Sequence, residues 1–337
     1  MRVTVLTWLE SERATTHDVV VDQVATALER GGHLVSIVGV HGDVHRLVDG
    51  IAVTAPELVF NLMEMFDDVL IGDVAVAGLL ELVGVPFTGS GPGELALCQN
   101  KALAKKLLSF DGVATPRFAV FEPGAPVGFD GLMPPLIVKP LRGDASIGVD
   151  ESRSLVDDAA ALARRVREIH DEVNDDAIAE EYVDGRELYV AIVGNDAPRA
   201  LPIIEIDFSG LPAGAPHLLG RRAKFEVGSA EYRGTRPVVA RLPDAVRARV
   251  TTAALDAYRT LGVRDYGRVD LRLTDAGEAF VIEVNASCYL EQKSELALAA
   301  RAAGIDYTTL VNRIAALAVE RFGRRAQPTI GAPVFTS

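Results

Sequence analysis

The chain has 337 residues, 49% of them hydrophobic and 24% charged, which is enough for two or three domains with large buried cores. Its net charge of -13, with no basic cluster, argues against nucleic acid as a partner, because such binding relies on lysine and arginine to neutralise phosphates. The two cysteines, Cys98 and Cys288, form no CxxC pair, so neither a zinc site nor a disulfide framework is predicted.

The N-terminal stretch carries no recognisable targeting signal. Residues 1–9 are apolar but lack the basic flank and the length of a signal peptide, and no apolar run approaches the length of a membrane span. We therefore expect a protein of the reducing cytoplasm with no membrane partner.

The first 95 residues alternate strand signals and helix signals. Strands are expected at 3–7, 34–38 and 58–61, helices at about 19–30 and 73–82, and a further short strand at Phe87 after a proline. Such alternation predicts a parallel α/β domain over residues 1–95.

The rest of the chain divides into two regions of different texture. In residues 96–185, a helix at 101–108 precedes strands at 136–139 and 178–183 and a helix near 156–169, which predicts an α+β module. In residues 186–326, we expect strands at 187–193 and 201–208, a long loop at 212–236, and helices at 244–261 and 307–321. The tail, 327–337, is expected to fray.

Residues 267–287, GRVDLRLTDAGEAFVIEVNAS, have the pattern of two strands around a turn. The segment 274–277 supplies the Asp and Gly that tight turns favour, and pairing Leu273 with Glu278 sets a register. In that register Val269 faces Ile282. The apolar face then consists of Val269, Leu271, Leu273, Phe280, Ile282 and Val284, with Leu271 opposite Phe280.

The other face of this predicted hairpin is polar. Arg268 lies opposite Glu283, Asp270 is diagonal to Glu283, and Asn285 follows two residues further along. A solvated sheet face would explain an isolated acidic pair. Three oxygen donors within one pleat are instead typical of a hard divalent cation such as Mg²⁺, especially when phosphate oxygens complete its shell. We therefore favour a metal site at Asp270, Glu283 and Asn285.

Three lysines before the hairpin are candidates for phosphate contacts. Lys101 begins a predicted helix and Lys224 lies in the long loop, although a single lysine is usually a solvated surface amine. Lys139 ends the nearly all-apolar strand PPLIVKP, where a strong anion would be needed to retain its charge. The following RGDASIGV places Ser146 between two glycines, in a loop that either turns its amides toward phosphate or makes an ordinary turn.

The stretch IAEEYVDGREL is a candidate for the nucleoside. Its apolar strand ends in a short connector, Glu180–Val183, and a turn then delivers Glu187. Backbone groups of such a connector can pair with the edge of an adenine, and a carboxylate beyond it can accept both ribose hydroxyls. A surface turn between strands with acidic ends explains the same residues equally well.

A series of motifs runs along almost the whole chain. In order they are LVFNLMEMF, VAGLLELVGVPFTGSG, LALCQNKALAKKLL, VATPRF, IVKP, EEYVDGRELYVAIVG and RVDLRLTDAGEAFVIEVNAS. In order and approximate spacing they resemble the ATP-grasp enzymes, and within them the D-alanine–D-alanine ligases and close relatives. The resemblance implies an N-terminal α/β domain (1–95), a linker helix and lid domain (96–185) and a catalytic domain (186–326).

The resemblance also implies a role for individual residues. ATP would lie between the lid and catalytic domains together with two Mg²⁺ ions, for which Mn²⁺ is an alternative. Lys101, Lys139 and Lys224 match phosphate contacts; Glu180, Glu181, Tyr182 and Val183 match the adenine connector, and Glu187 the ribose ligand. Asp270, Glu283 and Asn285 match the magnesium ligands, and Arg268 matches the arginine that steadies the phosphorylated intermediate.

The chain departs from the family pattern where substrates would bind. D-alanine–D-alanine ligases usually have a Gly-Gly-Xaa-Ser-Xaa-Glu segment where this chain has TWLESER, which makes Glu12 the match for the carboxylate that binds the first substrate's amine. In RGDASIGV, which matches the family's phosphate loop, Ser146 supplies the hydroxyl group that remains of the family pattern.

The second departure follows Asn285, where Cys288-Tyr289 replace the family's Pro-Gly. We expect the second substrate to be bound by Tyr289, Lys293 and Ser294, and to differ from free D-alanine, because a phenol ring adds bulk and removes close backbone access. In the alternative, Tyr289 points into the core and Ser294 caps the next helix.

The implied activity is that of an ATP-dependent ligase acting on small molecules. A carboxylate of an amino acid or small peptide attacks the γ-phosphate to give an acyl phosphate and ADP, and an amine then displaces phosphate through a tetrahedral state that Arg268 stabilises. The alternatives are D-alanine–D-alanine ligase itself and a small-molecule kinase of the same fold. The intact polar face disfavours a nucleotide-binding protein without catalysis. A homodimer is left open as the assembly.

Overall fold

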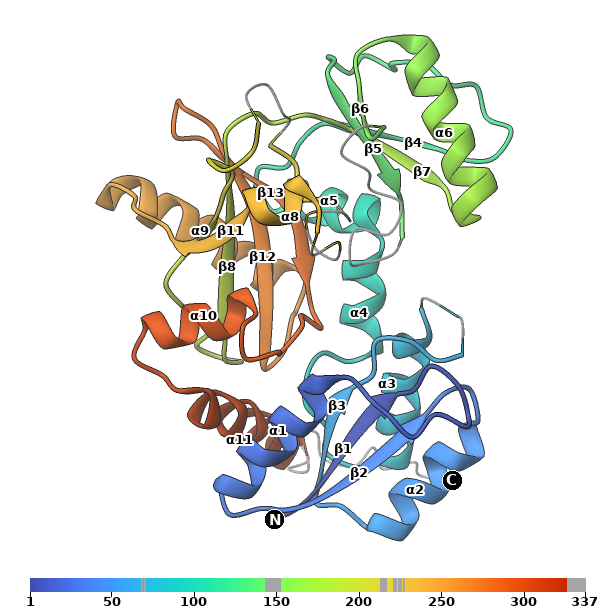
Figure 1. The fold of residues 1–337 in the computed structure, drawn as a ribbon, viewed down its shortest axis with the longest axis vertical. Helices are drawn as coiled ribbons and strands as arrows, with labels where there is room; N and C mark the ends of the chain where they lie inside the picture. The colour runs from blue at the N-terminus through green and yellow to red at the C-terminus, as the bar shows by residue number, and fades with distance from the viewer. Residues whose placement is uncertain are drawn as a thin grey trace, which may run out of the picture.

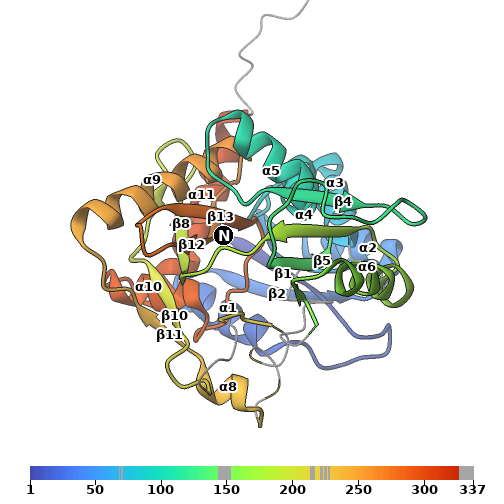
Figure 2. The same ribbon diagram turned by 90° about the horizontal axis from the view of Figure 1, so that it is seen from above.

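The computed structural model describes residues 1–67, 69, 71–142, 153–212, 217–220, 223, 226 and 228–325, and three β-sheets organise these residues (Figure 1). In that view the N-terminal sheet lies at the bottom, the large sheet at the upper left and a four-stranded sheet at the upper right. Figure 2 shows the same arrangement from above, with the N-terminal strands beneath the other two sheets. Within these ranges no helix combines the length and the apolar character that crossing a membrane requires.

The N-terminal region is a parallel α/β unit, as predicted from the alternating signals. Its strands pair in the order β2-β1-β3, all in parallel. The side chains of Asp18 and Asp43 cap the first two helices, and α2, which the sequence analysis missed, buries Leu47 and Ile51 one turn apart. The elements are β1 (Arg2–Trp8), α1 (Val19–Arg30), β2 (Leu34–Val40), α2 (Val44–Thr54), β3 (Leu58–Leu62) and α3 (Gly72–Val83).

Two helices, α4 (Pro92–Gln99) and α5 (Lys101–Phe110), connect this unit to the rest of the chain. A proline at the start of α4 and the side chain of Asn100, which accepts the amide of Leu103, mark where they begin. Lys101 and Lys105 are four residues apart, so they project from the same face of α5, and both are buried.

The four-stranded sheet lies within residues 96–185, where a lid was predicted, and its role as a lid stays a prediction. Its antiparallel strands follow the order β4-β7-β5-β6, and α6 covers one face with Leu162 and Val166 in a shared core (Figure 1). Lys139 lies near the end of β5, as predicted. The elements are β4 (Phe118–Phe121), β5 (Leu136–Pro140), β6 (Leu155–Val156), α6 (Ala159–Val173) and β7 (Ala177–Glu181).

The large sheet has the order β11-β10-β8-β12-β13, and β9 pairs with β8. The apolar side of its centre packs on α9, where Val250 and Ala254 are buried against Val269 and Leu271. The strands are β8 (Arg186–Val193), β9 (Arg199–Ala200), β10 (Ile204–Asp207), β11 (Arg236–Val239), β12 (Tyr266–Leu273) and β13 (Ala279–Asn285). The helices are α8 (Ala230–Gly234), α9 (Asp244–Thr260), α10 (Glu295–Ala302) and α11 (Tyr307–Arg325).

A single turn leads from β7 of the four-stranded sheet to β8 of the large sheet. Gly185 in this turn has a φ of 136°, and a Cβ there would stand 2.1 Å from the carbonyl oxygen of Leu273. Only glycine permits this approach of two backbones. The domain boundaries proposed at residues 95 and 185 stay predictions.

One buried carboxylate fixes the start of β12. Asp265 is 0% exposed and accepts hydrogen bonds from the Gly89 amide at 2.9 Å, Asn195 Nδ2 at 3.0 Å and Arg321 Nη2 at 2.8 Å. These donors come from the loop between α3 and α4, the loop after β8 and α11. The Asp265 side chain therefore joins the N-terminal unit to the large sheet.

The hairpin of β12 and β13 has a different register from the predicted one. Leu273 pairs with Ala279, and the pairing shifts between Asp270 and Leu271, which leaves Ile282 as an extra residue in a β-bulge. Beyond the bulge Arg268 faces Asn285, and Asp270 faces Glu283. The predicted pairing of Arg268 with Glu283, and the diagonal position of Asp270, were wrong.

The bulge also changes which side chains of β13 face the core. Val281 and Ala279 are buried beside Leu271 and Leu273, whereas Phe280 and Ile282 are only half-buried. An extra residue reverses the alternation of side chains along a strand, so the prediction of Phe280 and Ile282 on the apolar face was wrong. Val284, on the far side of the bulge, is buried as predicted.

Candidate active site

The polar face of β12 and β13 brings together the four residues predicted for metal and intermediate. Arg268 donates two hydrogen bonds to the Asp270 carboxylate, from Nε to Oδ1 at 2.7 Å and from Nη2 to Oδ2 at 2.9 Å. Asn285 Nδ2 donates to the same Oδ2 at 3.1 Å, and Glu283 stands directly across the hairpin from Asp270. The predicted convergence of oxygen donors is therefore present, although through direct pairing of Asp270 and Glu283.

Arg268 is held on further sides by groups from other elements. Its Cζ lies 4.5 Å from the centroid of the Tyr189 ring on β8, and its Nη1 lies 3.4 Å from Glu295 Oε2 at the start of α10. Burial disfavours the charged guanidinium, but Asp270 and Glu295 raise the pKa of Arg268 well above its usual value. The Arg268 guanidinium therefore stays positively charged and is held in one orientation.

The first residue of α5 reaches the same polar face, which is called the platform below and consists of Arg268, Asp270, Glu283 and Asn285. Lys101, only 7% exposed, places Nζ 3.4 Å from Glu283 Oε1. This contact balances one of the two acidic groups that face each other across the hairpin. Lys101, predicted as a phosphate contact at the start of a helix, thus lies beside a predicted metal ligand.

Two more lysines share one carboxylate behind the platform. Lys139 Nζ on β5 lies 3.0 Å from Glu180 Oε1, and Lys105 Nζ on α5 lies 3.3 Å from Glu180 Oε2. Lys105 Nζ also donates to the carbonyl of Ile282, in the β-bulge, at 3.0 Å. The cluster therefore links the lid sheet, α5 and the hairpin through buried side chains.

The charge states within this cluster follow from burial and pairing. Burial lowers the pKa of Lys105 to about 8 despite the nearby Glu180. Burial opposes ionisation of Glu180, but Lys105 and Lys139 together lower its pKa. Burial likewise opposes the charge on Lys139, and Glu180 and Glu283 raise its pKa. Two cations on one carboxylate make the cluster attractive to an anion.

Glu187, predicted to hold the ribose, lies at the start of β8. Its Oε1 accepts a hydrogen bond from the Tyr189 hydroxyl at 2.8 Å, and its Oε2 lies 3.6 Å from Arg272 Nη1. Arg272 Nη2 in turn donates to the Tyr182 hydroxyl at 3.0 Å. Glu187 and Tyr182 are therefore brought together through Arg272.

The connector from β7 presents its two glutamates differently. Glu180 faces the lysine cluster, whereas Glu181 Oε1 accepts the Met133 amide at 2.8 Å and lies 3.3 Å from Arg117. The Tyr182 amide donates to the Pro135 carbonyl at 2.9 Å, and Val183 follows half-buried. The Glu181 side chain thus belongs to the lid, so a role for it in nucleotide binding would fall to its backbone.

Glu12, matched to the amine of the first substrate, is bound to the start of α2. Its Oε1 accepts the amides of Gly42 and Asp43 at 2.8 and 2.9 Å, and its Oε2 lies 3.1 Å from Arg46 Nη1. The Gly42 amide is the main cause that lowers the pKa of Glu12. Ser146 and Lys224, the remaining phosphate candidates, lie outside the described residues.

The three residues expected at the second substrate occupy the chain after β13. Tyr289 is 39% exposed and donates its hydroxyl to Asp18 Oδ1 at 2.7 Å, so the alternative that it points into the core was wrong. Ser294 is buried and caps α10 by accepting the Ala297 amide, which confirms the other half of that alternative. Lys293 is exposed.

The platform residues are chemically suited to a nucleoside triphosphate with a divalent cation. Each cation already touches a carboxylate: Lys101 touches Glu283, and Arg268 touches Asp270. On nucleotide binding, phosphate oxygens could pair with Lys101 and Arg268, and a divalent cation could bind the carboxylates of Asp270 and Glu283. Each buried charge would then keep a partner of opposite sign. Across the described ranges His, Cys, Asp and Glu form no trio suited to a metal, which leaves Asn285 and phosphate oxygens to complete a shell around Asp270 and Glu283.

Comparison with known proteins shows to which family the chain belongs. The family model "D-ala D-ala ligase C-terminus" matches residues 128–316. The chain is 35% identical to D-alanine–D-alanine ligase of Desulforudis audaxviator, over 88% of this chain and 92% of that protein. The chain belongs to the D-alanine–D-alanine ligase family. It is also 33% identical to an uncharacterized protein, y4sG, of Sinorhizobium fredii, over 90% of this chain and 88% of that protein.

Solved structures of the D-alanine–D-alanine ligase family have the same fold. The crystal structure of D-alanine–D-alanine ligase from Bacillus anthracis has a TM-score of 0.78 at 25% identity and covers 96% of this chain and 99% of its own. The complex of that ligase with ATP has a TM-score of 0.77 at 24% identity, with the same coverage. The chain is thus an ATP-grasp enzyme, an ADP-forming ligase that joins a carboxylate to an amine.

Several polar residues of this family member were missed by the sequence analysis. Lys105 could have been found, because it lies one helical turn after Lys101. Arg272 and Tyr189 could have been found from the alternation of β12 and β8, since both lie on the polar face. Glu295 had no sequence signal, because only the folding of α10 back over the sheet brings it to Arg268.

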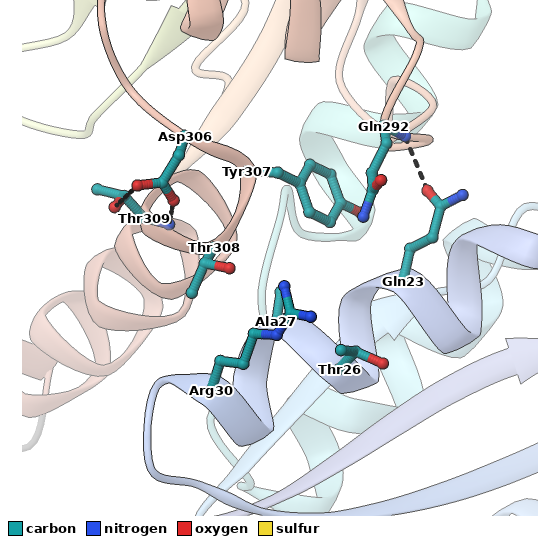
Figure 3. A pocket seen from close by; sticks show the side chains of 9 residues that line it. All are labelled: Gln23, Thr26, Ala27, Arg30, Gln292, Asp306, Tyr307, Thr308 and Thr309. Carbon is teal, nitrogen blue, oxygen red and sulfur yellow. Dashed lines mark hydrogen bonds between the residues drawn. The ribbon is translucent and has the colours of Figure 1, made fainter.

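A separate cavity of about 440 Å³ lies between α1 and the start of α11 (Figure 3). Gln23 Oε1 accepts the Gln292 amide at 2.8 Å across this cavity, and the Tyr307 hydroxyl donates to the Leu290 carbonyl at 2.8 Å. Both bonds hold the chain segment that also carries Tyr289 and Ser294. In this ligase family member the segment predicted to bind the second substrate is therefore held by the N-terminal unit and by α11.

Proposed function

We propose that this ligase uses Mg²⁺ with ATP to join the carboxylate of an amino acid or small peptide to an amine other than free D-alanine. The observation that carries the proposal is a row of two cation–carboxylate pairs on the polar face of the hairpin. Arg268 contacts Asp270 and Lys101 contacts Glu283, and the two carboxylates face each other between the cations, in a partly buried setting. Such a row can exchange its internal partners for a phosphate chain and a metal.

In the first step the substrate carboxylate attacks the γ-phosphate, the bond from that phosphorus to the β–γ bridging oxygen breaks, and ADP leaves. Lys101 and Lys139 would bind phosphate oxygens, and Ser146 and Lys224 are proposed for the same task. Asp270, Glu283 and Asn285 would hold two Mg²⁺ ions, and when bound these would supply positive charge that neutralises the triphosphate. Glu187 would accept the ribose hydroxyls while the Glu180–Val183 connector faces the adenine.

In the second step an amine attacks the acyl phosphate, and inorganic phosphate leaves as the new C–N bond forms. The tetrahedral state carries negative charge on the former carboxylate oxygen. Arg268 is suited to stabilise it, because its guanidinium is oriented by Asp270, Tyr189 and Glu295 before the charge develops.

The proposal that the acceptor is not free D-alanine rests on the segment after Asn285. Relatives of this chain are named D-alanine–D-alanine ligase, so D-alanine is the first amine to test. Tyr289 adds a ring at the point where the family places glycine, and its hydroxyl is anchored on Asp18. A ring in this position reduces the room for a small substrate and offers an apolar surface to a larger one.

The test is ADP release with Mg²⁺ and ATP across a panel of amino-acid pairs and dipeptides, with the product identified by mass. We expect ADP release to require two substrates, and an amide product that is not D-alanyl-D-alanine. Efficient formation of D-alanyl-D-alanine would overturn the acceptor proposal and support the cell-wall enzyme. Stoichiometric ADP release with a single substrate and a stable phosphorylated product would identify a small-molecule kinase instead.

A further inference from the structure

Lys105 on α5 is a buried charged residue to which the proposed reaction gives no role. It is 1% exposed and lies one helical turn after Lys101, which is proposed to bind phosphate. Its Nζ lies 3.3 Å from Glu180 Oε2 and donates to the carbonyl of Ile282 at 3.0 Å. Burial lowers the pKa of Lys105 to about 8, so the charge is held at a cost that a neutral side chain would not have. A role beyond filling space is therefore indicated.

The Ile282 carbonyl belongs to the β-bulge in β13, the edge strand of the large sheet. In a regular edge strand, consecutive residues direct their backbone groups alternately toward the neighbouring strand and away from it. At the bulge the Val281 amide donates to the Ala114 carbonyl at 2.8 Å, and the Ile282 carbonyl accepts from Lys105. Both partners come from α5 and the chain directly after it. These contacts therefore hold the bulge from outside the sheet.

The bulge decides on which face of the sheet the acidic and amide groups of β13 lie. Without the extra residue, the pairing at the turn end of the hairpin would continue and set Ile282 opposite Asp270. The same continuation would turn Glu283 to the apolar face, opposite Val269. With the extra residue, Glu283 pairs with Asp270, and Asn285 lies on the same polar face. The shared face of the three proposed metal ligands thus depends on one bulge.

Helix α5 holds this part of β13 at two points. Lys101 Nζ lies 3.4 Å from Glu283 Oε1, on the side chain of a proposed metal ligand. One turn later, Lys105 holds the backbone of the residue directly before Glu283. Lys105 in turn contacts Glu180, at the C-terminal end of β7 in the four-stranded sheet. One buried ammonium group thus joins the connector proposed to face the adenine to the strand that supplies two proposed metal ligands.

We propose that Lys105 is a positioning residue that keeps the metal ligands of β13 on the platform by holding the bulge at Ile282. It contacts neither metal nor substrate and acts through Glu283, the next residue along the strand. An ammonium group suits this role, because a charged donor forms a stronger hydrogen bond to a carbonyl than a neutral one does. This inference rests on the proposed function, since it requires a divalent cation at the platform.

The test measures Mn²⁺ binding by electron paramagnetic resonance in the presence of a saturating nonhydrolysable ATP analogue. We expect Lys105→Met to weaken Mn²⁺ binding at least about tenfold, because a group that orients a metal ligand is lost. The affinity for the analogue in EDTA should change by less than about threefold, since Lys139 still contacts Glu180. In metal-free protein, hydrogen exchange should become faster at the amides of residues 281–285 and stay unchanged in β10.

Leu108→Ala controls for a general loss of stability. Leu108 is 2% exposed on the same helix and packs in the large hydrophobic core, so this variant is also less stable. It removes no contact to Glu180 or Ile282 and should bind Mn²⁺ within about twofold of wild type. Lys106→Met, at the exposed neighbouring position, should match wild type in every measurement. An equal loss of Mn²⁺ affinity in Leu108→Ala would overturn the inference.

Lys105→Arg tests whether this position requires a charged donor. It should bind Mn²⁺ at least about threefold more tightly than Lys105→Met, because a guanidinium group can also donate to the Ile282 carbonyl. Should Lys105→Met fail to fold, Lys105→Gln, which is polar, uncharged and shorter, takes its place with the same expected loss. Unchanged Mn²⁺ affinity in the uncharged variant, or equal affinities of the arginine and uncharged variants, would contradict the role of Lys105.

The same measurements separate this inference from the proposed function. Wild-type protein that binds Mn²⁺ and forms an amide product, with a Lys105→Met variant of equal Mn²⁺ affinity, would contradict only the role of Lys105. A Mn²⁺ site that depends on Lys105, in a protein that forms no amide with any substrate pair, would contradict only the proposed reaction. Wild-type protein that binds no Mn²⁺ together with the analogue would contradict both.

Discussion

The hairpin platform and the chain that follows it, residues 286–294, are neighbours in sequence but are held in place in different ways. On the platform, Arg268, Asp270 and Asn285 bind one another within two paired strands. In the following segment, Tyr289 binds Asp18 and the Gln292 amide binds Gln23, partners that lie 271 and 269 residues away in the chain. The mutual contacts of the platform residues thus come from the pairing of two neighbouring strands, whereas the position of the following segment depends on contacts with the N-terminal unit. Under the proposed function, changes in those contacts would alter substrate choice more than the chemical step.

The largest effect is expected from breaking the platform itself. Asp270→Asn or Glu283→Gln should lower turnover at least about a hundredfold, about 2.7 kcal/mol of transition-state stabilisation, because each removes a charged ligand of the proposed metal. Circular dichroism should show that the fold persists. Asp275→Asn and Glu278→Gln, which change exposed residues in the turn of the same hairpin, serve as matched controls and should stay within about twofold of wild type. Near-normal turnover in both platform variants would remove the metal assignment.

A substitution in α5 tests how far the platform depends on residues outside the hairpin. Lys105→Met should lower the free energy of unfolding by about 2–4 kcal/mol, since Glu180 loses one of two cations and the Ile282 carbonyl loses its donor. Urea denaturation measures the change. Lys106→Met, at the exposed neighbouring position, should change stability by less than about 0.5 kcal/mol. Equal changes in the free energy of unfolding for the two variants would contradict a stabilising role of the buried contacts of Lys105.

The pH dependence of the same pair of proteins gives a second check. The pKa of Lys105 is lowered to about 8 in the folded protein from 10.5 in the unfolded chain. Between these values the unfolded chain holds more protons, so the contribution of Lys105 to stability rises with pH across this window. The difference in unfolding free energy between wild type and Lys105→Met should therefore widen from pH 8 to pH 10. A difference that narrows would show that folded Lys105 keeps its proton.

The smallest effect is expected in the segment after the platform. Tyr289→Phe removes the hydrogen bond to Asp18, worth about 1 kcal/mol at a partly exposed site, and should raise the KM for the amine substrate about threefold with kcat little changed. Tyr232→Phe, on α8 and equally exposed at 39%, is the control and should have no effect. A fall in kcat with an unchanged KM would instead place Tyr289 in the chemical step.

Local patterns in the sequence predicted most elements of the fold. The helix expected at 19–30 coincides with α1 because Asp18 caps its start and Gly31 follows its end. The turn at Asp184-Gly185 was predicted from its Asp-Gly pair, and in the structure only glycine fits there beside Leu273. By contrast α2, α4 and α10 were missed. Helices α4 and α10 have only 8 residues each, too few for a clear periodic pattern, whereas α2 carried a readable signal in the Asp43 cap and in Leu47 and Ile51 one turn apart.

By itself, the sequence determined which residues share the polar face proposed as the reaction centre. Alternation along a strand puts Arg268 and Asp270 on one face, and Glu283 and Asn285 follow from the partner strand. Only the tertiary structure decided how they pair. The bulge at Ile282, whose carbonyl accepts a bond from Lys105 on a helix 177 residues away, sets Asp270 directly against Glu283. Tertiary structure likewise binds Glu12 to α2. The reason is physical: side-chain alternation is a property of each strand, whereas bulges and charge partners depend on elements that meet only once the chain has folded.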